Sequence, residues 1–320
     1  VRFDLVRGES WYNDRLPGVI RLLEERGLVR ESEGALVVDL SDEGLPVCIV
    51  RKRDGGYNYA TTDLATVLAR EEEFHPDAVI YVTDERQQLH FRQIFAIARR
   101  LGVATRLEHV WFGLMRLPEG TFSTRQGNVI KLERLLDEAE ERALALVREN
   151  SPDMPAERQL EVARAVGIGA VKYADLSQNP QSLVTFTWDK ALAMDGNSAP
   201  YLQYACARIS SVLDKYAERY DPAALTAATV RFTDPIERRL AVLLVRFCET
   251  VLDAANGCRP NLLADHLFEL AQTYSRFYQT LPFLRAPEGI RESRLKIGMA
   301  VAQALRTGLG LLGIETPSRI

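Results

Sequence analysis

Three short segments place carboxylates, amides and a histidine directly after apolar runs that are typical of strands. RGESWY (7–12) follows the opening run VRFDLV, and YNYATTD (57–63) follows PVCIVRK and a turn. TDERQQLH (83–90) follows DAVIYV. Ligands of open parallel sheets bind beyond the carboxyl ends of the strands. The polar residues of these segments are therefore candidates for touching a ligand: Glu9, Ser10, Asp63, Asp84, Gln87, Gln88 and His90.

Each candidate also has a plain structural explanation. Glu9 could be a solvated loop acid, and Gln87 and its neighbour could be ordinary polar residues of a first helical turn. Asp63 could complement the dipole of a helix that Thr61 or Thr62 caps, a role worth about 0.3–1 kcal/mol. The residue types alone leave these alternatives open.

A fourth segment, TFSTRQGN (121–128), could bind phosphate. Backbone N–H groups of such a Gly-, Ser- and Thr-rich loop can hold a polyphosphate, and Arg125 could then meet the developing charge. A hairpin or surface loop is the alternative, and residue types alone favour it. The sequence contains neither a Walker loop nor a dinucleotide-binding fingerprint.

Residues 1 to about 135 alternate short apolar runs with amphipathic stretches, which predicts strands and helices in turn. DAVIYVTD, a helix over QLHFRQIFAIARRLG and the strand HVWFGLM form a βαβ unit, which is expected to be right-handed. We therefore predict a parallel, doubly wound sheet. The other expected strands are VRFDLV, GALVVDL and PVCIVRK, and the other expected helices lie in GVIRLLEERGLV and YNYATTDLATVLAREEEF.

From about residue 134 onward the apolar residues recur every 3.6 positions, which predicts an all-α bundle. Turn-forming residues at 150–153 suggest a boundary there, giving an α/β domain over 1–150 and a helical domain over 151–320. The expected helices are LERLLDEAEERALALVREN and residues 155–176, 198–219, 234–256, 261–281 and 289–312.

Composition and charge exclude several classes of protein. The 320 residues are 47% hydrophobic and 26% charged, which is ordinary globular composition. A net charge of −4 argues against binding nucleic acid over the whole surface but allows a local basic groove. No apolar run approaches the roughly 18 residues of a membrane span, and no signal peptide opens the chain. We therefore expect a cytoplasmic protein with no membrane partner.

The cysteines and histidines do not suggest a metal site. Cys48, Cys206, Cys248 and Cys258 are far apart and lack the paired spacing of zinc ligands. The four histidines are scattered as well. We predict reduced, buried thiols, as in a cytosolic protein, and no structural metal.

These segments also carry a resemblance that covers essentially the whole chain in order. The chain resembles arginyl-tRNA synthetases, which are class I aminoacyl-tRNA synthetases. The YATTDLA and APYLQYA strings distinguish arginine enzymes from other class I members. The matching strings are GES (8–10), DGGYNYATTDLA (54–65), IYVTDERQQLHF (80–91), EHVWFGLM (108–115), FSTRQGNVIKL (122–132), GIGAVKYADLSQN (167–179), DGNSAPYLQYACAR (195–208) and the final LRTGLGLLGIETPSRI.

The resemblance implies a fold and an arginine pocket. The fold would be the second half of a Rossmann-like catalytic domain followed by a helical anticodon-binding domain. Glu9 and Asp63 would bind the arginine guanidinium, with Tyr59 and Gln87 completing the pocket. Carboxylates that accept paired hydrogen bonds suit a planar cation with five donors. Two converging carboxylates repel each other when empty, and the substrate cation relieves that repulsion.

The resemblance also implies an ATP side to the site. His90, Gly113 and Met115 would face ATP, which Mg²⁺ accompanies. The FSTRQGN loop occupies the position of the class I Lys-Met-Ser-Lys-Ser loop but lacks both lysines. Its catalytic residues would be Ser123, Thr124 and Arg125, with Arg125 stabilising the phosphate.

In the helical domain the resemblance implies contacts with the tRNA anticodon. Tyr201, Tyr204 and Arg208 lie at i, i+3 and i+7, on one helix face, and Tyr278 and Ile320 would approach from the other side. Unpaired bases can stack on tyrosines for roughly 1–3 kcal/mol per base. Tyrosines at helical spacing more often pack a core, and the resemblance favours RNA contact for Tyr204 and Arg208. Phe186 and Trp188 are expected in the core, and Lys172 could face the tRNA or cap a helix.

The implied function is that of an arginine–tRNA ligase, with arginine, ATP and tRNA(Arg) as partners, acting as a monomer. The His-Ile-Gly-His-like signature of class I enzymes is absent, and the sequence opens on Val1 within a strand-like run. We therefore interpret the chain as a C-terminal portion that does not activate arginine alone. One alternative is a non-catalytic fragment or paralogue that binds RNA or partners. A nucleotide-binding helical scaffold unrelated to tRNA would explain the βαβ unit but not the ordered strings.

Overall fold

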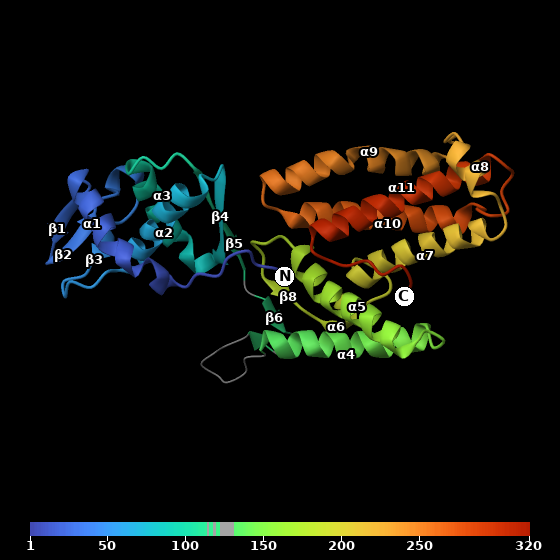
Figure 1. Ribbon diagram of the computed structural model, residues 1–320, viewed down its shortest axis with the longest axis horizontal. Helices are drawn as coiled ribbons and strands as arrows, with labels where there is room; N and C mark the ends of the chain where they lie inside the picture. Colours follow the sequence, from blue (N-terminus) through green and yellow to red (C-terminus); the bar gives the residue numbers. More distant parts are fainter. Residues whose placement is uncertain (114, 118–119, 122–130) are drawn as a thin grey trace. The chain divides into compact units, whose positions relative to one another are not determined.

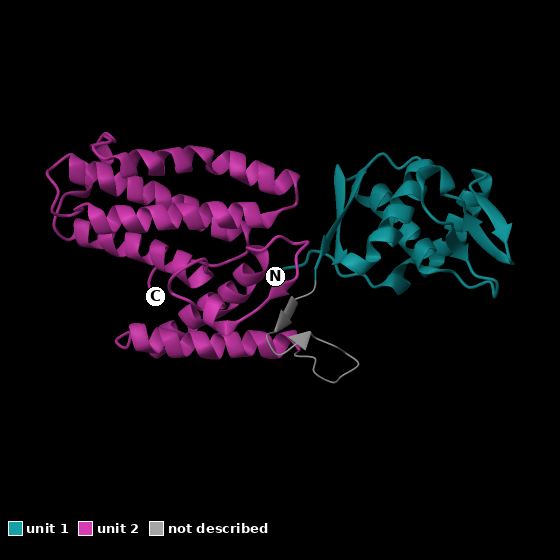
Figure 2. Cartoon of the chain, turned by 180° about the vertical axis from the view of Figure 1, so that it is seen from behind, with its two compact units in different colours: residues 1–113 teal, residues 114–320 magenta. Residues whose placement is uncertain are grey.

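The computed structural model describes residues 1–113, 115–117, 120–121 and 131–320. The chain forms two compact units, Val1–Gly113 and Leu114–Ile320 (Figure 2). The division expected near residue 150 lies within the second unit. That residues 1–150 form the catalytic part and residues 151–320 the anticodon-binding part stays a prediction.

The first unit alternates short strands and helices, as its sequence predicts (Figure 1). Its elements are the 3-10 helix η1 (Glu9–Arg15), α1 (Leu16–Glu25), β1 (Val29–Ser32), β2 (Ala35–Val38), η2 (Ser41–Glu43), β3 (Cys48–Arg51), α2 (Tyr59–Phe74), β4 (Ala78–Asp84), η3 (Glu85–Gln87), α3 (Gln88–Arg100) and β5 (Arg106–Phe112).

The predicted βαβ unit is confirmed. β4 and β5 pair in parallel from Ala78 opposite Arg106 to Asp84 opposite Phe112, and α3 connects them. The carboxyl end of β4 leads directly into η3 and α3. The apolar sides of α1, α2 and α3 close one core, with Leu23, Leu64, Ile94 and Ile97 fully buried.

Two sequence expectations about strands are wrong. Residues 1–6 form no strand, and Val1, Phe3 and Val6 are exposed. A strand needs a hydrogen-bonded neighbour, and none of the described strands pairs with this run. GALVVDL and PVCIVRK do contain strands, but β2 and β3 belong to an antiparallel meander with β1 and not to the parallel sheet. A tight hairpin turn connects β1 to β2, and such short connections join antiparallel strands only.

Helix α2 begins earlier than expected. Its N-cap is Asn58, whose side-chain oxygen accepts a hydrogen bond from the backbone N–H of Tyr59 at 3.0 Å. Thr61 and Thr62 are therefore not caps but lie inside the helix. The hydroxyl of Thr61 instead donates to the carbonyl of Val50 at 2.5 Å, which ties the start of α2 to the end of β3.

The second unit is mainly helical, and all six helices expected from periodicity are confirmed within a few residues (Figure 1). A short strand after residue 134 was not expected; β8 pairs in parallel with β6. The elements are β6 (Met115–Leu117), β7 (Gly120–Thr121), α4 (Leu132–Asn150), α5 (Ala156–Leu176), β8 (Val184–Thr185), α6 (Trp188–Ala191), α7 (Ala199–Ala217), α8 (Pro222–Ala227), α9 (Pro235–Asn256), α10 (Pro260–Thr280) and α11 (Ile290–Leu311).

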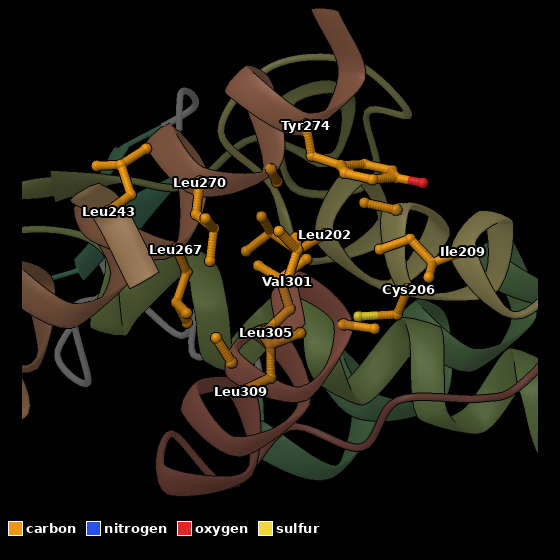
Figure 3. Close-up of a cluster of buried hydrophobic side chains, with 14 of the residues drawn as sticks. Leu202, Cys206, Ile209, Leu243, Leu267, Leu270, Tyr274, Val301, Leu305 and Leu309 are labelled. Carbon is orange, nitrogen blue, oxygen red and sulfur yellow. The ribbon is translucent and has the colours of Figure 1, made fainter. Parts of the chain in front are cut away.

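Local sequence signals explain where these helices begin. Prolines occupy the first turn of α7, α9 and α10, where the missing N–H is not needed. Asp234 and Glu237 form a capping box at the start of α9. The buried faces of α7, α9, α10 and α11 then meet in one core, in which Leu202, Leu267 and Leu305 point toward one another (Figure 3).

The structure also places the residues that the sequence analysis assigned to cores. Phe186 is buried, and Trp188 is half-buried against it. Cys48 and Cys206 are buried as expected, and burial raises the pKa of the Cys48 thiol to about 11. The expectation fails for Cys248, which is exposed on α9. In the described part of the chain, no helix is both long and apolar enough to cross a membrane.

Candidate functional site

Asp63 and His90 form the closest polar contact among the candidate residues of the first unit. His90 Nε2 lies 2.5 Å from Asp63 Oδ2, and the two side chains are only 26% and 33% exposed. Because a carboxylate oxygen accepts hydrogen bonds, the geometry assigns the ring proton to Nε2, which donates to Oδ2. The contact joins α2 to α3, beyond the carboxyl end of β4.

A row of aromatic rings supports His90. The ring of Phe91 meets the ring of His90 edge-on at 5.4 Å and packs on the ring of His109 at 4.6 Å. His109 Nε2 is hydrogen-bonded to the hydroxyl of Thr83 at 2.8 Å. The pKa of His109 is lowered, mainly by burial and to a smaller extent by the nearby His90. Both effects favour the neutral form of His109, which lies on β5 beside β4.

Tyr59 and Gln87 precede Asp63 and His90 by about one helical turn. Tyr59 is the first residue of α2, four positions before Asp63, so both lie on one helix face. The residue is 70% exposed. Gln87 ends η3, three residues before His90, and is exposed. The start of α2 thus carries the exposed Tyr59 and the carboxylate of Asp63, and Gln87 places an exposed amide just before α3.

Glu9 is exposed at the start of η1, and in the described part of the chain no hydrogen bond joins it to Asp63, Tyr59 or Gln87. The segment before it is fixed by Arg7, whose guanidinium donates to both carboxylate oxygens of Glu73 at 2.6 and 2.7 Å. Tyr12, the buried residue of η1, anchors the rest of that helix in the core.

Asp84 has a local role. Its carboxylate accepts from the backbone N–H of Arg86 at 2.8 Å and from the guanidinium of the same residue at 2.8 and 2.9 Å. These bonds from Arg86 lower the pKa of Asp84. Asp84 therefore caps η3 and is already satisfied within its own turn.

The residues expected on the ATP side are placed only in part. Gly113 directly follows β5 and is half-buried. Met115 is the first residue of β6. Ser123, Thr124 and Arg125 lie outside the described residues.

An open groove of about 1030 Å³ crosses the second unit. The turn between α4 and α5, one face of α7, the end of α10 and the C-terminal tail line it. Four of the five residues that the sequence analysis expected to contact RNA line this groove: Tyr204, Arg208, Tyr278 and Ile320.

Arg208 lies between two tyrosines of the groove. Its guanidinium carbon is 4.6 Å from the ring centre of Tyr204 and 5.4 Å from that of Tyr278. Such cation–π contacts hold a guanidinium in place without neutralising it. Tyr201, in contrast, points between α7 and α10, where its hydroxyl donates to Ser275 Oγ at 3.1 Å. The structure thus separates Tyr201 from the other tyrosines.

The groove contains basic residues that the sequence analysis missed. Arg158, Lys215 and Arg319 line it together with Arg208. Arg319 is paired with Asp214 at 3.3 Å, an exposed ion pair. One signal could have identified Lys215, because it lies seven positions after Arg208, on the same face of α7. No local pattern points to Arg158, which comes from α5.

Lys172, for which the sequence left open a contact with tRNA or a helix-capping role, is hydrogen-bonded to the C-terminal tail. Its ammonium group donates to the carbonyl of Gly313, two residues after the end of α11. This contact ties α5 to the C-terminal tail. The same tail is held by the amide of Gln203, which donates to the carbonyl of Glu315 at 2.7 Å.

The described residues include no group of three or more His, Cys, Asp or Glu side chains that could hold a metal ion. The expectation that the protein has no structural metal stays a prediction. The carboxylate of Asp63 already accepts a hydrogen bond from His90. Its other oxygen can accept further hydrogen bonds, as a ligand that carries N–H donors would require.

Comparison with known protein families gives matches over almost the whole chain. Residues 1–188 match the family of tRNA synthetases class I (R), catalytic domain. Residues 202–320 match the DALR anticodon binding domain. The first match covers all the candidate residues of the first unit, and the second covers Tyr204, Arg208, Tyr278 and Ile320.

Individual relatives agree with the family matches. An arginine–tRNA ligase of Laribacter hongkongensis is 47% identical over 319 residues, which is 97% of this chain and 55% of that protein. Arginyl-tRNA synthetase from Thermus thermophilus superimposes with a TM-score of 0.83 at 30% identity, over 98% of this chain and 59% of that one. The Plasmodium falciparum structure gives a TM-score of 0.84 at 25% identity, over 100% of this chain and 55% of that one. The chain therefore spans about half the length of the relatives that it matches.

Proposed function

This chain belongs to the family of class I arginyl-tRNA synthetases, and from that premise we propose that the protein containing it is a cytoplasmic arginine–tRNA ligase. In the proposed reaction the carboxylate of arginine attacks the α-phosphorus of ATP, and pyrophosphate leaves. A ribose hydroxyl at the 3′ end of tRNA(Arg) then attacks the activated carbonyl carbon, loses its proton and displaces AMP.

The observation that carries the proposal is the half-buried carboxylate of Asp63, one helical turn after the exposed Tyr59 on the same face of α2. A carboxylate in this setting can accept hydrogen bonds from a guanidinium, while the tyrosine ring offers an apolar face to the plane of the cation. Gln87 would add an amide at the rim. Glu9, at the start of η1, would supply the second carboxylate.

The other partners are proposed from the remaining residues. Gly113 and Met115 would lie near ATP, and Ser123, Thr124 and Arg125 would stabilise its phosphates during transfer. Mg²⁺ would arrive with the phosphates of ATP, and no described residue is assigned to it. The groove around Tyr204 and Arg208 would bind the anticodon region of the tRNA, and the protein would act as a monomer.

The test of the arginine pocket is the variant Asp63→Asn in the full-length protein. Removing one charge-assisted hydrogen-bond partner costs roughly 1.5–3 kcal/mol, so we expect the KM for arginine to rise about 10- to 150-fold. The KM for ATP should stay within about twofold. Asp14→Asn removes an exposed carboxylate of η1 and serves as the control. Equal losses for arginine and ATP would remove Asp63 from the amino-acid site.

A second experiment addresses this chain by itself. The His-Ile-Gly-His-like signature of class I enzymes is absent from its 320 residues. We expect the isolated chain, given ATP, arginine and cognate tRNA, to form no arginyl-tRNA. Robust aminoacylation by the isolated chain would contradict this expectation. Binding of tRNA without aminoacylation would support the alternative that the chain can serve as an RNA-binding module.

A further inference from the structure

The carboxylate of Asp63 presents its two oxygens unequally. Oδ2 accepts a hydrogen bond from His90 Nε2, whereas Oδ1 has no hydrogen-bond partner among the described residues. A carboxylate on a short side chain can turn about its last torsion with little resistance. A donor fixed to Oδ2 therefore decides where Oδ1 points.

His90 can act as that donor because its own ring is held. Phe91 packs between the rings of His90 and His109, and His109 is fixed by Thr83 of β4. The contacts run without a break from the parallel sheet through α3 to Asp63 on α2. A group held by such supporting contacts keeps its geometry before a ligand arrives.

The direction of the proton matters as well. With the proton on Nε2, the imidazole donates to Asp63 and leaves the carboxylate able to accept further bonds. On the neighbouring elements, Tyr81 of β4 is buried with its ring against Arg70, and no hydrogen bond joins either residue to Asp63 in the described part of the chain.

We propose that His90 is a positioning residue of the amino-acid site, where its Nε2–H holds Oδ2 of Asp63 so that Oδ1 faces the arginine guanidinium. The inference rests on the proposed function. It assigns His90 to the arginine side of the site instead of the ATP side. Loss of the hydrogen bond should therefore weaken the use of arginine without changing the use of ATP.

The reach of the side chain provides a sharp test in the full-length protein. The amide nitrogen of glutamine extends about as far as Nε2, whereas that of asparagine ends near the position of Nδ1. We expect His90→Gln to keep the KM for arginine within about threefold of wild type. His90→Asn should raise it about tenfold or more, the usual effect of losing a hydrogen bond to a charged group. The KM for ATP should not change in either variant.

His75→Asn is the matched control. His75 ends the same helix, α2, is exposed and has a φ of 45°, a left-handed conformation that asparagine adopts readily. We expect this variant to have wild-type KM values for both substrates. Thermal unfolding of all three variants shows whether the folded state is retained.

Several outcomes would overturn the proposal. A rise in the KM for ATP alone in His90→Asn would assign His90 to the nucleotide, and equal losses in the Gln and Asn variants would show that reach does not matter. If His90→Asn does not fold, ¹⁵N NMR of labelled histidine in the wild-type protein decides: a neutral His90 protonated only on Nδ1 refutes the inference. If the wild-type protein forms no arginyl-tRNA, the proposed function fails instead.

Discussion

Arg294 Nε donates a hydrogen bond to Glu237 Oε1 at 2.8 Å, and both side chains are almost completely buried. Burial alone would raise the pKa of Glu237, but hydrogen bonds from Thr233, Arg294 and Asp234 lower it overall. The same guanidinium also donates to the carbonyl of Pro282 at 2.7 Å. One ion pair thus joins the start of α9, the first turns of α11 and the loop after α10.

Breaking this pair should destabilise the second unit strongly. In Arg294→Met the carboxylate of Glu237 stays buried with its charged partner gone, which typically costs about 3–5 kcal/mol. Urea unfolding should reveal a loss of that size. Arg239→Met, on the same helix as Glu237, breaks an exposed pair with Glu269 and should cost at most about 1 kcal/mol. Similar losses for the two variants would contradict the special role of the buried pair.

Gly167 allows α4 and α5 to approach closely. A Cβ atom at this position would lie 2.5 Å from the carbonyl oxygen of Ala139, well inside contact distance. Gly167→Ala should therefore separate the helices and destabilise the protein by about 1–3 kcal/mol. At Gly310 of α11 a Cβ would meet nothing within 4 Å. Gly310→Ala should instead stabilise by up to about 1 kcal/mol. Thermal unfolding should reveal opposite signs for the two substitutions.

Much of the fold could be predicted because its signals are local. The helices of the second unit follow from apolar residues every 3.6 positions and from prolines such as Pro200, Pro235 and Pro260 in their first turns. The β4–α3–β5 unit follows from two apolar runs separated by one helix-length segment. In each case the pattern lies within a single stretch of chain.

What could not be predicted depends on residues far apart in sequence. Asp63 and His90 are separated by 27 positions on two helices, and periodicity says nothing about how those helices are rotated toward each other. The strand β1 was missed because three of its four residues, Arg30, Glu31 and Ser32, are polar. VRFDLV looks like a strand, but its strand-like residues have no partner among the described strands.

His266 should make the second unit sensitive to acid. The pKa of His266 is lowered, mainly by burial; Glu269 raises it and Arg246 lowers it to smaller extents. Its Nε2 atom is buried and has no hydrogen-bond partner among the described residues. Because the folded state holds the proton less tightly than the unfolded chain, stability is full above the ordinary pKa of 6.5 and falls as the pH drops below it. Each unit of pKa depression corresponds to about 1.4 kcal/mol.

The substitution His266→Gln removes this titration. We expect its unfolding free energy, followed by urea denaturation between pH 7.5 and pH 5 (about the range in which histidine titrates), to fall less than that of wild type. His75→Gln changes an exposed histidine and should follow the wild-type curve. A His266→Gln curve parallel to wild type over the whole range would show that His266 does not contribute to the acid sensitivity.

Arg208 should contribute charge to RNA binding through the groove. Its guanidinium is held by Tyr204 and Tyr278, so the positive charge is positioned but not neutralised. If it meets a phosphate, Arg208→Gln in the full-length protein should weaken tRNA binding and reduce the slope of log affinity against log salt by about one. Arg208→Lys keeps the charge and should keep the slope. It should lose part of the affinity, because an ammonium group cannot make the planar contacts of a guanidinium.

Tyr278 separates this electrostatic contribution from stacking. Tyr278→Ala should weaken tRNA binding by about 5- to 150-fold if a base stacks on the ring, at roughly 1–3 kcal/mol per base, and should leave the salt slope almost unchanged. Tyr278→Phe keeps the ring and should bind nearly as wild type. Arg164→Gln removes an exposed arginine of α5 outside the groove and controls for general charge. Equal effects of Arg164→Gln and Arg208→Gln on the slope would mean that the groove is not where the RNA backbone lies.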